Sequence, residues 1–147
     1  MEVTQTGRIT KIRLALGLLR RKETFLIARR NGEVYWSFPG LTLPPNSTDT
    51  NVVLTQYLLA NLRGLGFAKR QRLLYSFSYD GTDEYHNSCS VQIFDADITS
   101  AKIKPNREEL EQISFKDFGF ITKTLFEKGA LHPLMIPLLS CLSRKTI

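Results

Sequence analysis

The sequence predicts an α+β sandwich in a single domain that spans residues 1–147. Alternating apolar and polar stretches come first, a leucine-patterned helix follows, and then come more strands and two helices. This order differs from the regular alternation of strand and helix that builds a parallel sheet. A length of 147 residues suits one domain with its own core. No repeat, low-complexity segment or internal linker divides the chain.

The N-terminal third is predicted to form three strands joined by short turns. Asn31-Gly32 favours a hairpin between the second and third strands, because both residues tolerate positive φ. Pro39-Gly40 ends the third strand, since proline donates no ladder hydrogen bond and glycine permits a tight turn. A loop over residues 41–48 follows. The predicted strands span residues 9–19, 24–29 and 34–38.

Leucines at helical spacing predict the first helix. Four residues are candidate N-caps, namely Ser47, Thr48, Asp49 and Thr50. The apolar face consists of Leu54, Leu58, Leu62 and Leu65, with Tyr57 beside it. Gly64 or Gly66 is expected to end the helix as a left-handed residue.

The second half is predicted to form three strands and two helices. The alternation in residues 88–98 is the cleanest in the chain, with Cys89 on one face and Phe94 on the other. Asp117 is expected to cap a helix that ends before Gly129. A last helix over residues 134–142 should be short or kinked at Pro137. The predicted strands span residues 70–79, 88–98 and 113–115, with a turn at 80–83 and a loop that begins at 104–106. Leu73, Tyr75, Phe77 and Tyr79 are expected on one side of the first of them.

Charge and cysteine content suggest a cytoplasmic protein with anionic partners. The formal net charge of +6 favours nucleotides, RNA or DNA, and it is equally compatible with an ordinary solvated basic surface. Cys89 and Cys141 form no metal-ligand cluster and are expected to be buried free thiols, as in a reducing cytosol. No signal-peptide pattern or membrane-spanning apolar run is present, so no membrane partner is expected.

One stretch resembles a known family. Trp36-Ser37-Phe38-Pro39-Gly40, followed by a loop and the helix that ends near Gly66, resembles the strand end and catalytic helix of the Nudix (MutT-like) hydrolases. The order of elements and the segment 104–109 ahead of a strand agree with this resemblance. It implies an α/β/α sandwich with a mixed, mostly antiparallel sheet. It also implies a nucleoside-diphosphate derivative as substrate and Mg²⁺ or Mn²⁺ held by glutamates of the helix.

The helix lacks those glutamates. Residues 50–79 contain no Asp or Glu. If Gly66 is the last glycine of the family motif, the acidic positions fall on Ala60, Arg63 and Gly64, and the loop glutamate falls on Asn51. If Gly64 takes that place, they fall on Leu58, Asn61 and Leu62. The Nudix box is therefore degenerate, and no metal ligand is predicted within it.

Acidic residues elsewhere are the remaining candidates for catalysis. Glu108 and Glu109, with Glu111 nearby, precede the last strand, where some Nudix hydrolases carry a catalytic carboxylate. A solvated helix turn is the favoured alternative for this group. A second acidic group contains Asp80, Asp83 and Glu84, with His86 nearby. The simpler explanation is that these residues belong to a turn and have no catalytic role.

A binding role for the pocket is the main functional prediction. Arg63 is hypothesised to contact a phosphate directly, where the family uses a metal ion. A surface arginine that favours the helix dipole is the alternative. Arg29, Trp36, Phe38, Gly40 and Tyr79 are the other predicted ligand-binding residues, although burial in the core equally accounts for the aromatic ones. Further cations that are expected to add to the positive electrostatic potential at this site are Arg30, Lys69, Arg70 and Arg72.

Three functions remain open. The first is a Nudix-fold protein that binds a nucleotide or a nucleoside-diphosphate-linked ligand without standard metal-dependent catalysis. The second is a divergent hydrolase with Mg²⁺ or Mn²⁺ ligands outside the box helix. The third is a basic module that binds nucleic acid or a protein partner.

Overall fold

The computed structural model describes residues 11–68, 72–100 and 102–145. The strands are β1 (Ile12–Arg21), β2 (Thr24–Arg30), β3 (Gly40–Thr42), β4 (Leu62–Arg63), β5 (Leu74–Thr82), β6 (Ser88–Asp97), β7 (Lys104–Pro105) and β8 (Leu110–Asp117). The helices are α1 (Thr50–Asn61), the π-helical segment η2 (Phe120–Leu125) and α2 (Met135–Lys145). Among these helices, none is long and apolar enough to span a membrane.

The main sheet is mixed and mostly antiparallel. Its strands lie in the order β5-β6-β1-β2-β8, and β3 pairs with β1 as well. Only the pairing of β1 with β6 is parallel, and it includes Leu16 opposite Ile93. The other pairings of the main sheet are antiparallel. The predicted sheet type is confirmed.

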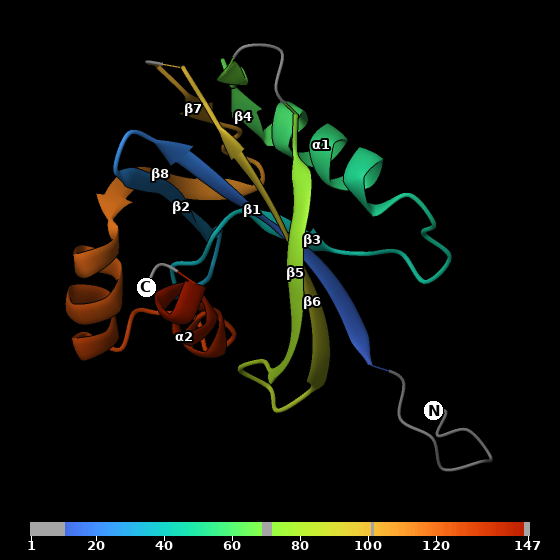
Figure 1. Ribbon diagram of the computed structural model, residues 1–147, viewed down its shortest axis with the longest axis vertical. Helices are drawn as coiled ribbons and strands as arrows, with labels where there is room; N and C mark the ends of the chain where they lie inside the picture. Colours follow the sequence, from blue (N-terminus) through green and yellow to red (C-terminus); the bar gives the residue numbers. More distant parts are fainter. Residues whose placement is uncertain (1–10, 69–71, 101, 146–147) are drawn as a thin grey trace.

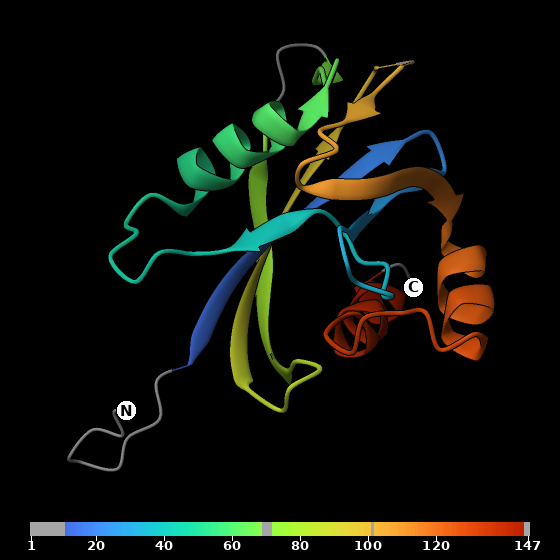
Figure 2. The same ribbon diagram turned by 180° about the vertical axis from the view of Figure 1, so that it is seen from behind.

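Helices cover both faces of this sheet (Figure 1; Figure 2). On one face, Val91 and Ile93 of β6 pack with Leu138 of α2 and Ile121 of η2. On the other face, Phe94 of β6 packs with the buried leucines of α1. The alternation predicted for residues 88–98 is correct, because successive strand residues point to opposite faces. The molecule is thus an α/β/α sandwich with a core on each side of the sheet.

The third strand lies later in the chain than predicted. Residues 34–38 form no ladder, because the backbone of Trp36 donates to Ala130 whereas that of Ser37 pairs with Ala28. The strand begins at Gly40, the second residue of the Pro39-Gly40 turn that was expected to end it. A Cβ on Gly40 would overlap the carbonyl oxygen of Ala15 and lie 2.8 Å from the Cα of Leu16. Glycine therefore permits the close approach of β3 to β1.

Helix α1 is capped as predicted but ends earlier. The Asp49 carboxylate accepts a hydrogen bond from the backbone N–H of Val52 at 3.3 Å. The helix ends at Asn61, because the chain turns into β4 and pairs with β7. Gly64 follows with φ +89, and a Cβ there would lie 2.5 Å from the carbonyl oxygen of Lys102. The left-handed glycine is therefore Gly64, two residues beyond the C-cap Leu62.

The strand β5 departs from simple alternation. It runs to Thr82, into the turn predicted at residues 80–83, and the turn instead begins at Asp83, whose carboxylate accepts from the backbone N–H groups of Tyr85 and Asn87. A register shift between Tyr75 and Phe77 reverses which face each residue takes. Tyr75 is 56% exposed, whereas Phe77 and Tyr79 pack on the core. The prediction of one shared face is wrong, because Leu73 packs in the core that contains Phe94, on the face opposite Phe77 and Tyr79. Residues 70 and 71, the expected start of this strand, lie outside the described residues.

The C-terminal elements follow the predicted caps but not the predicted lengths. Strand β8 extends beyond residues 113–115, and residues 104–105 pair with β4 instead of forming only a loop. The Asp117 carboxylate accepts from the backbone N–H of Phe120 at 2.7 Å, and Gly129 has φ +68, as expected for the two ends of this helix. Helix α2 is not shortened at Pro137. Proline lies in the first turn, where its missing N–H has no intrahelical acceptor. Neither Cys89, which is buried, nor Cys141, which is half-buried, is in a disulfide.

Candidate functional site

A cavity of about 200 Å³ opens beside the N-terminal half of β1, and we call it the β1 cavity. Apolar side chains of β1 and α2 form its base, and polar side chains lie around them. Its lining residues are Ile12, Leu14, Leu16, Arg30, Glu33, Ser37, Phe38, Gly40, Thr42, Asp83, Glu84, Tyr85, Cys89, His132, Leu134 and Met135.

The segment Ser37–Gly40 forms one wall of the β1 cavity. Phe38 is buried and packs against Phe25 of β2, with ring centroids 5.8 Å apart. The Arg30 guanidinium donates to the carbonyl oxygen of Gly40 at 2.6 Å. A cation is therefore fixed at the edge of the cavity by the same backbone that brings β3 onto β1.

An acidic group and a histidine form another wall. Nε2 of His132 lies 2.8 Å from Oε1 of Glu84, and these side chains are only 15% and 17% exposed. The His132 Nδ1 accepts from the backbone N–H of Leu134, so its neutral form carries the proton on Nε2. Burial would raise the pKa of Asp83, but hydrogen bonds from Asn87 and Tyr85 hold this pKa below its ordinary value. This wall offers carboxylate acceptors to a ligand.

A hydrogen-bond network joins the end of α1 to the turn before β8. We call it the helix–turn network, and it contains Arg30, Tyr57, Asn61, Asn106 and Glu109. The Tyr57 hydroxyl donates to Oε2 of Glu109 at 2.7 Å, and Nε of Arg30 lies 3.8 Å from the same oxygen. The Asn61 side chain accepts from Nδ2 of Asn106 at 3.0 Å and donates to the carbonyl oxygen of Tyr57. Burial and then Glu109 raise the pKa of Tyr57.

Comparison with solved structures identifies the fold. No family model matches the sequence, and no curated protein matches it. The structure is similar to the MutT protein from Methanosarcina mazei Go1, with a TM-score of 0.67 and 15% identity over 95% of this chain and 97% of that chain. The chain has the Nudix fold.

Two further structures carry the same likeness. A MutT Nudix hydrolase from Burkholderia pseudomallei aligns with a TM-score of 0.61 and 12% identity, over 75% of this chain and 85% of that chain. A UDP-X diphosphatase aligns with a TM-score of 0.53 and 13% identity over 80% of this chain, which spans only 56% of that protein's length. The predicted Nudix resemblance is confirmed for the fold.

The residues of α1 do not fit the metal that the Nudix motif implies. The motif register that ends on Gly64 has its last glycine in the left-handed conformation, which Gly66 does not adopt. Its acidic positions then fall on Leu58, Asn61 and Leu62, all of them buried. Mg²⁺ requires oxygen ligands. Leucine has none, and the Asn61 oxygen already accepts a hydrogen bond. Across residues 11–68, 72–100 and 102–145, no three His, Cys, Asp or Glu side chains are grouped to hold a metal ion.

The structure brings some of the predicted site residues to the β1 cavity and leaves others elsewhere. Phe38 and Gly40 line the cavity, and the Tyr79 hydroxyl donates to the carbonyl oxygen of Leu134 beneath it. Trp36 lines a second cavity, and the guanidinium carbon of Arg29 lies 5.9 Å from the centroid of the Trp36 ring.

The remaining predicted residues lie outside the two cavities. Arg63 is exposed on β4, opposite Lys104. Glu108 is exposed in the turn before β8, and it lies neither in the predicted helix turn nor in a cavity. Glu109 belongs to the helix–turn network. Arg72 is exposed, and Lys69 and Arg70 lie outside the described residues.

Sequence reasoning missed the importance of Arg30, Tyr57 and His132. Arg30 stood among several basic residues, and no local pattern separates it from Arg29. Tyr57 was placed beside the leucine face of α1, but its partner Glu109 is 52 residues away. His132 faces Glu84 across a comparable distance in the sequence. Only the tertiary fold reveals these pairs.

Proposed function

We propose that this protein binds a nucleotide or a nucleoside-diphosphate-linked ligand in the β1 cavity, without standard metal-dependent Nudix hydrolysis. The observation that carries the proposal is the helix–turn network. Its two members on α1, Tyr57 and Asn61, are neutral and already paired with Glu109 and Asn106, where the Nudix motif carries metal-binding glutamates.

The lining of the β1 cavity suits the two ends of such a ligand. Carboxylate oxygens of Asp83 and Glu84 accept N–H groups of a nucleobase edge. The Arg30 guanidinium offers further donors to a phosphate at the cavity edge. Apolar Leu14 and Leu16 cover the base of the cavity, as is typical of small-molecule sites.

The absence of metal ligands on α1 explains why binding is proposed without hydrolysis. A metal ion stabilises the transition state of such reactions by several kcal/mol. Each ~1.4 kcal/mol corresponds to a factor of about ten in rate. Without that contribution, hydrolysis of a diphosphate should fall below detection.

Titration calorimetry in the presence of a chelator tests binding. A panel of UDP- and ADP-linked compounds is titrated into the parent protein, Arg30→Met and Thr42→Trp. Thr42 is exposed at the cavity edge, so a tryptophan there blocks the cavity with little risk to folding. We expect Thr42→Trp to abolish binding. Arg30→Met should weaken it about tenfold, the effect of losing a charge-assisted contact of ~1.4 kcal/mol.

Arg63→Met is the matched control. It removes an exposed cation that lines neither the β1 cavity nor the second cavity, so binding should be unchanged. If Arg63→Met loses binding and the other two variants do not, the sequence-based hypothesis that Arg63 contacts the phosphate would be favoured. Unchanged binding in Thr42→Trp would reject the β1 cavity as the site.

A phosphate-release assay with Mg²⁺ or Mn²⁺ tests the second half of the proposal. No metal-dependent release is expected from the same panel. Release that depends on metal and disappears in Glu109→Gln would establish the alternative, a divergent hydrolase that uses Glu109. Salt-sensitive RNA or DNA binding that survives Thr42→Trp would instead favour an interaction module with a basic surface.

A further inference from the structure

A second cavity of about 350 Å³ lies between β8 and η2, and we call it the β8 cavity. Its volume falls in the range of small-molecule sites, roughly 300–1,000 Å³. It shares no lining residue with the β1 cavity. Its lining residues are Ile27, Trp36, Gln112, Ile113, Ser114, Lys116, Phe120, Leu125, Lys128 and Ala130.

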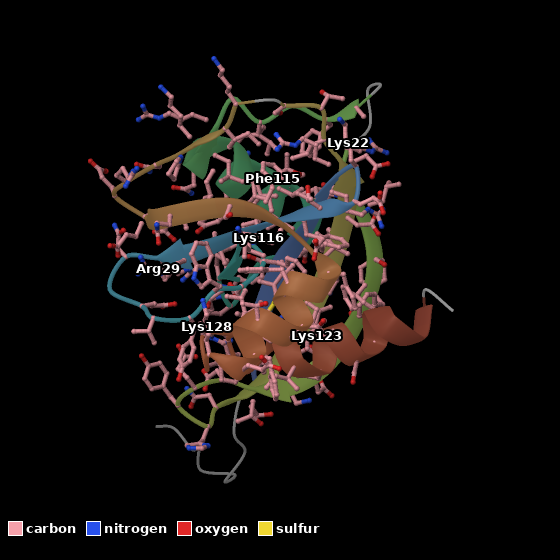
Figure 3. All side chains as sticks on the ribbon, turned by 90° about the vertical axis from the view of Figure 1, so that its left-hand side faces the viewer. Lys22, Arg29, Phe115, Lys116, Lys123 and Lys128 are labelled. Carbon is pink, nitrogen blue, oxygen red and sulfur yellow. The ribbon has the colours of Figure 1, made fainter. Side chains whose placement is uncertain are left out.

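Strand β8 supplies a polar wall. Gln112, Ser114 and Lys116 alternate along the strand, so their side chains lie on one face of the sheet. Phe115 lies on the other face, where the guanidinium carbon of Arg21 is 3.7 Å from its ring centroid. Figure 3 views this side of the molecule and labels Lys116 on β8 and Lys128 beyond the helix.

The π-helical segment supplies an apolar wall. Phe120 and Leu125 are five residues apart and both line the cavity, as the wider turn of a π-helix allows. The same spacing continues at its end, where the backbone N–H of Ala130 donates to the carbonyl oxygen of Leu125 at 3.0 Å. Short π-helical turns are rare and are frequent at functional sites.

The charge of the β8 cavity is positive. Two lysines line it and no acidic residue does, whereas Glu33, Asp83 and Glu84 all line the β1 cavity. Nζ of Lys116 lies 4.6 Å from the centroid of the Phe120 ring. Lys128 is exposed, and its side-chain ammonium makes no hydrogen bond or ion pair within the part of the chain that the structure describes.

Arg29, at the edge of this region, is already neutralised. Its guanidinium donates to the Glu111 carboxylate at 3.2 Å and to the Gln112 side-chain oxygen at 2.8 Å. The amide nitrogen of Gln112 remains a donor for a ligand. The cations left for an anionic ligand are therefore Lys116 and Lys128.

We propose that the β8 cavity is a second ligand site, which takes a flat aromatic ring bearing a phosphate, the chemistry of a single nucleotide unit. The ring lies among Trp36, Phe120 and Leu125, and the phosphate lies between Lys116 and Lys128. A free nucleoside monophosphate and the terminal nucleotide of a single strand share this chemistry. The proposal goes beyond binding at the β1 cavity and does not depend on it.

Trp36 makes the site directly measurable. It is the only tryptophan in the chain and it lines the β8 cavity. The experiment follows Trp36 fluorescence during titration with a nucleoside monophosphate, the same nucleoside without phosphate, inorganic phosphate, and a short single-stranded oligonucleotide of the same base. We expect saturable quenching by the monophosphate, and much weaker effects of the nucleoside or of phosphate alone.

Lysine variants assign the effect to the cavity. Lys128→Gln and Lys116→Gln should each raise the apparent Kd about fivefold, as expected for the loss of one charge-assisted contact. Lys123→Gln is the matched control, because Lys123 is exposed on η2, next to the cavity wall, but does not line the cavity. Thr42→Trp adds a second tryptophan, so it is compared by calorimetry, where monophosphate binding at this site should persist.

The outcomes separate support from rejection. Tighter binding of the oligonucleotide, with the same variant pattern, would identify a strand end as the source of the ligand. Absence of saturable quenching, equal quenching by the nucleoside alone, or equal effects of Lys123→Gln and Lys128→Gln would each overturn the proposal. Loss of monophosphate binding in Thr42→Trp would also overturn it, since the ligand would then occupy the β1 cavity.

Discussion

The hydroxyl of Tyr57 makes the shortest side-chain contact of the helix–turn network. It donates to the Glu109 carboxylate at 2.7 Å and so ties α1 to the turn before β8. A phenol is neutral and a glutamate at this end of the helix would be charged. The contact therefore stabilises the fold, because Tyr57 donates a hydrogen bond to a charged acceptor.

Replacing Tyr57 by phenylalanine should destabilise the protein. Hydrogen bonds to charged groups contribute roughly 1.5–3 kcal/mol, and the lower end is expected because the Glu109 side chain is 34% exposed. Chemical denaturation should show a loss of about 1.5 kcal/mol in Tyr57→Phe. Tyr75→Phe is the control, because that hydroxyl contacts Ser78 in an exposed position. Equal stabilities of the two variants would show that the Tyr57 contact contributes nothing.

Alkaline pH provides a second measurement on the same variant. Burial and then Glu109 raise the pKa of Tyr57 in the folded protein. A raised pKa stabilises the fold below the pKa of the unfolded chain, about 10, and this contribution is lost as pH rises through the folded pKa. The parent should therefore lose stability more steeply above about pH 10 than Tyr57→Phe does.

At the scale of elements, the close approach of β3 to β1 rests on one residue. Gly40 lies opposite Leu16, and a Cβ there would overlap the carbonyl oxygen of Ala15. The obstacle is backbone within the sheet, so it cannot move aside as the end of a long side chain can. The same approach fixes the wall of the β1 cavity.

Gly40→Ala should cost about 3 kcal/mol, the upper end of the usual range for overpacking. It should also weaken any ligand of the β1 cavity, because β3 must move. Gly66→Ala is the matched control, since its Cβ would meet only Ser100 Oγ at an ordinary 3.5 Å. Thermal or chemical unfolding measures both variants. A Gly40→Ala protein as stable as Gly66→Ala would mean that β3 does not pack against β1 as described.

The elements also show what could be predicted from the sequence. The alternation in β6 was predictable because both faces of the strand are covered and the period is regular. The register shift at Tyr75 was not, because only Ser76 lies at the shift and no glycine or proline marks it. The segment 34–38 carries strand-forming residues, yet its partners Ala28 and Ala130 lie on different elements, which local propensity does not encode.

The candidate site follows the same pattern. Phe38 and Gly40 were identified through a short motif, and they line the β1 cavity. Arg63 was selected from a helix register that placed it toward a pocket, but the helix ends two residues earlier. Whether the register uses Gly64 or Gly66 depends on a backbone dihedral angle, and both glycines fit the sequence pattern equally well.

At the scale of the whole molecule, the protein combines a Nudix fold with a helix that offers no carboxylate. Helix α1 contributes buried Leu54 and Leu58 to the core, and buried Leu62 follows it at the start of β4. We therefore expect the fold not to depend on a bound ion. The free energy of unfolding should be the same with and without a bound metal ion.

Neither Mg²⁺ nor Mn²⁺ should raise the melting temperature. A ligand at one hundred times its Kd stabilises a folded protein by roughly 2.7 kcal/mol, which a thermal scan detects readily. Scans with each metal and with a chelator should superimpose. A saturable increase with Mn²⁺ would contradict this prediction and would direct attention to carboxylates outside α1.

The parallel pairing of β1 with β6 has a consequence for how the chain is made. Ile12 pairs with Cys89, so the central strand must wait for a partner far along the sequence. Contacts between distant residues slow folding, because a long loop must close before they form. On the ribosome, the apolar residues Ala15–Leu19 emerge well before β6 and the helices that cover them. The nascent chain therefore exposes this apolar segment until β6 has been synthesised. The segment is the expected binding site for a general chaperone.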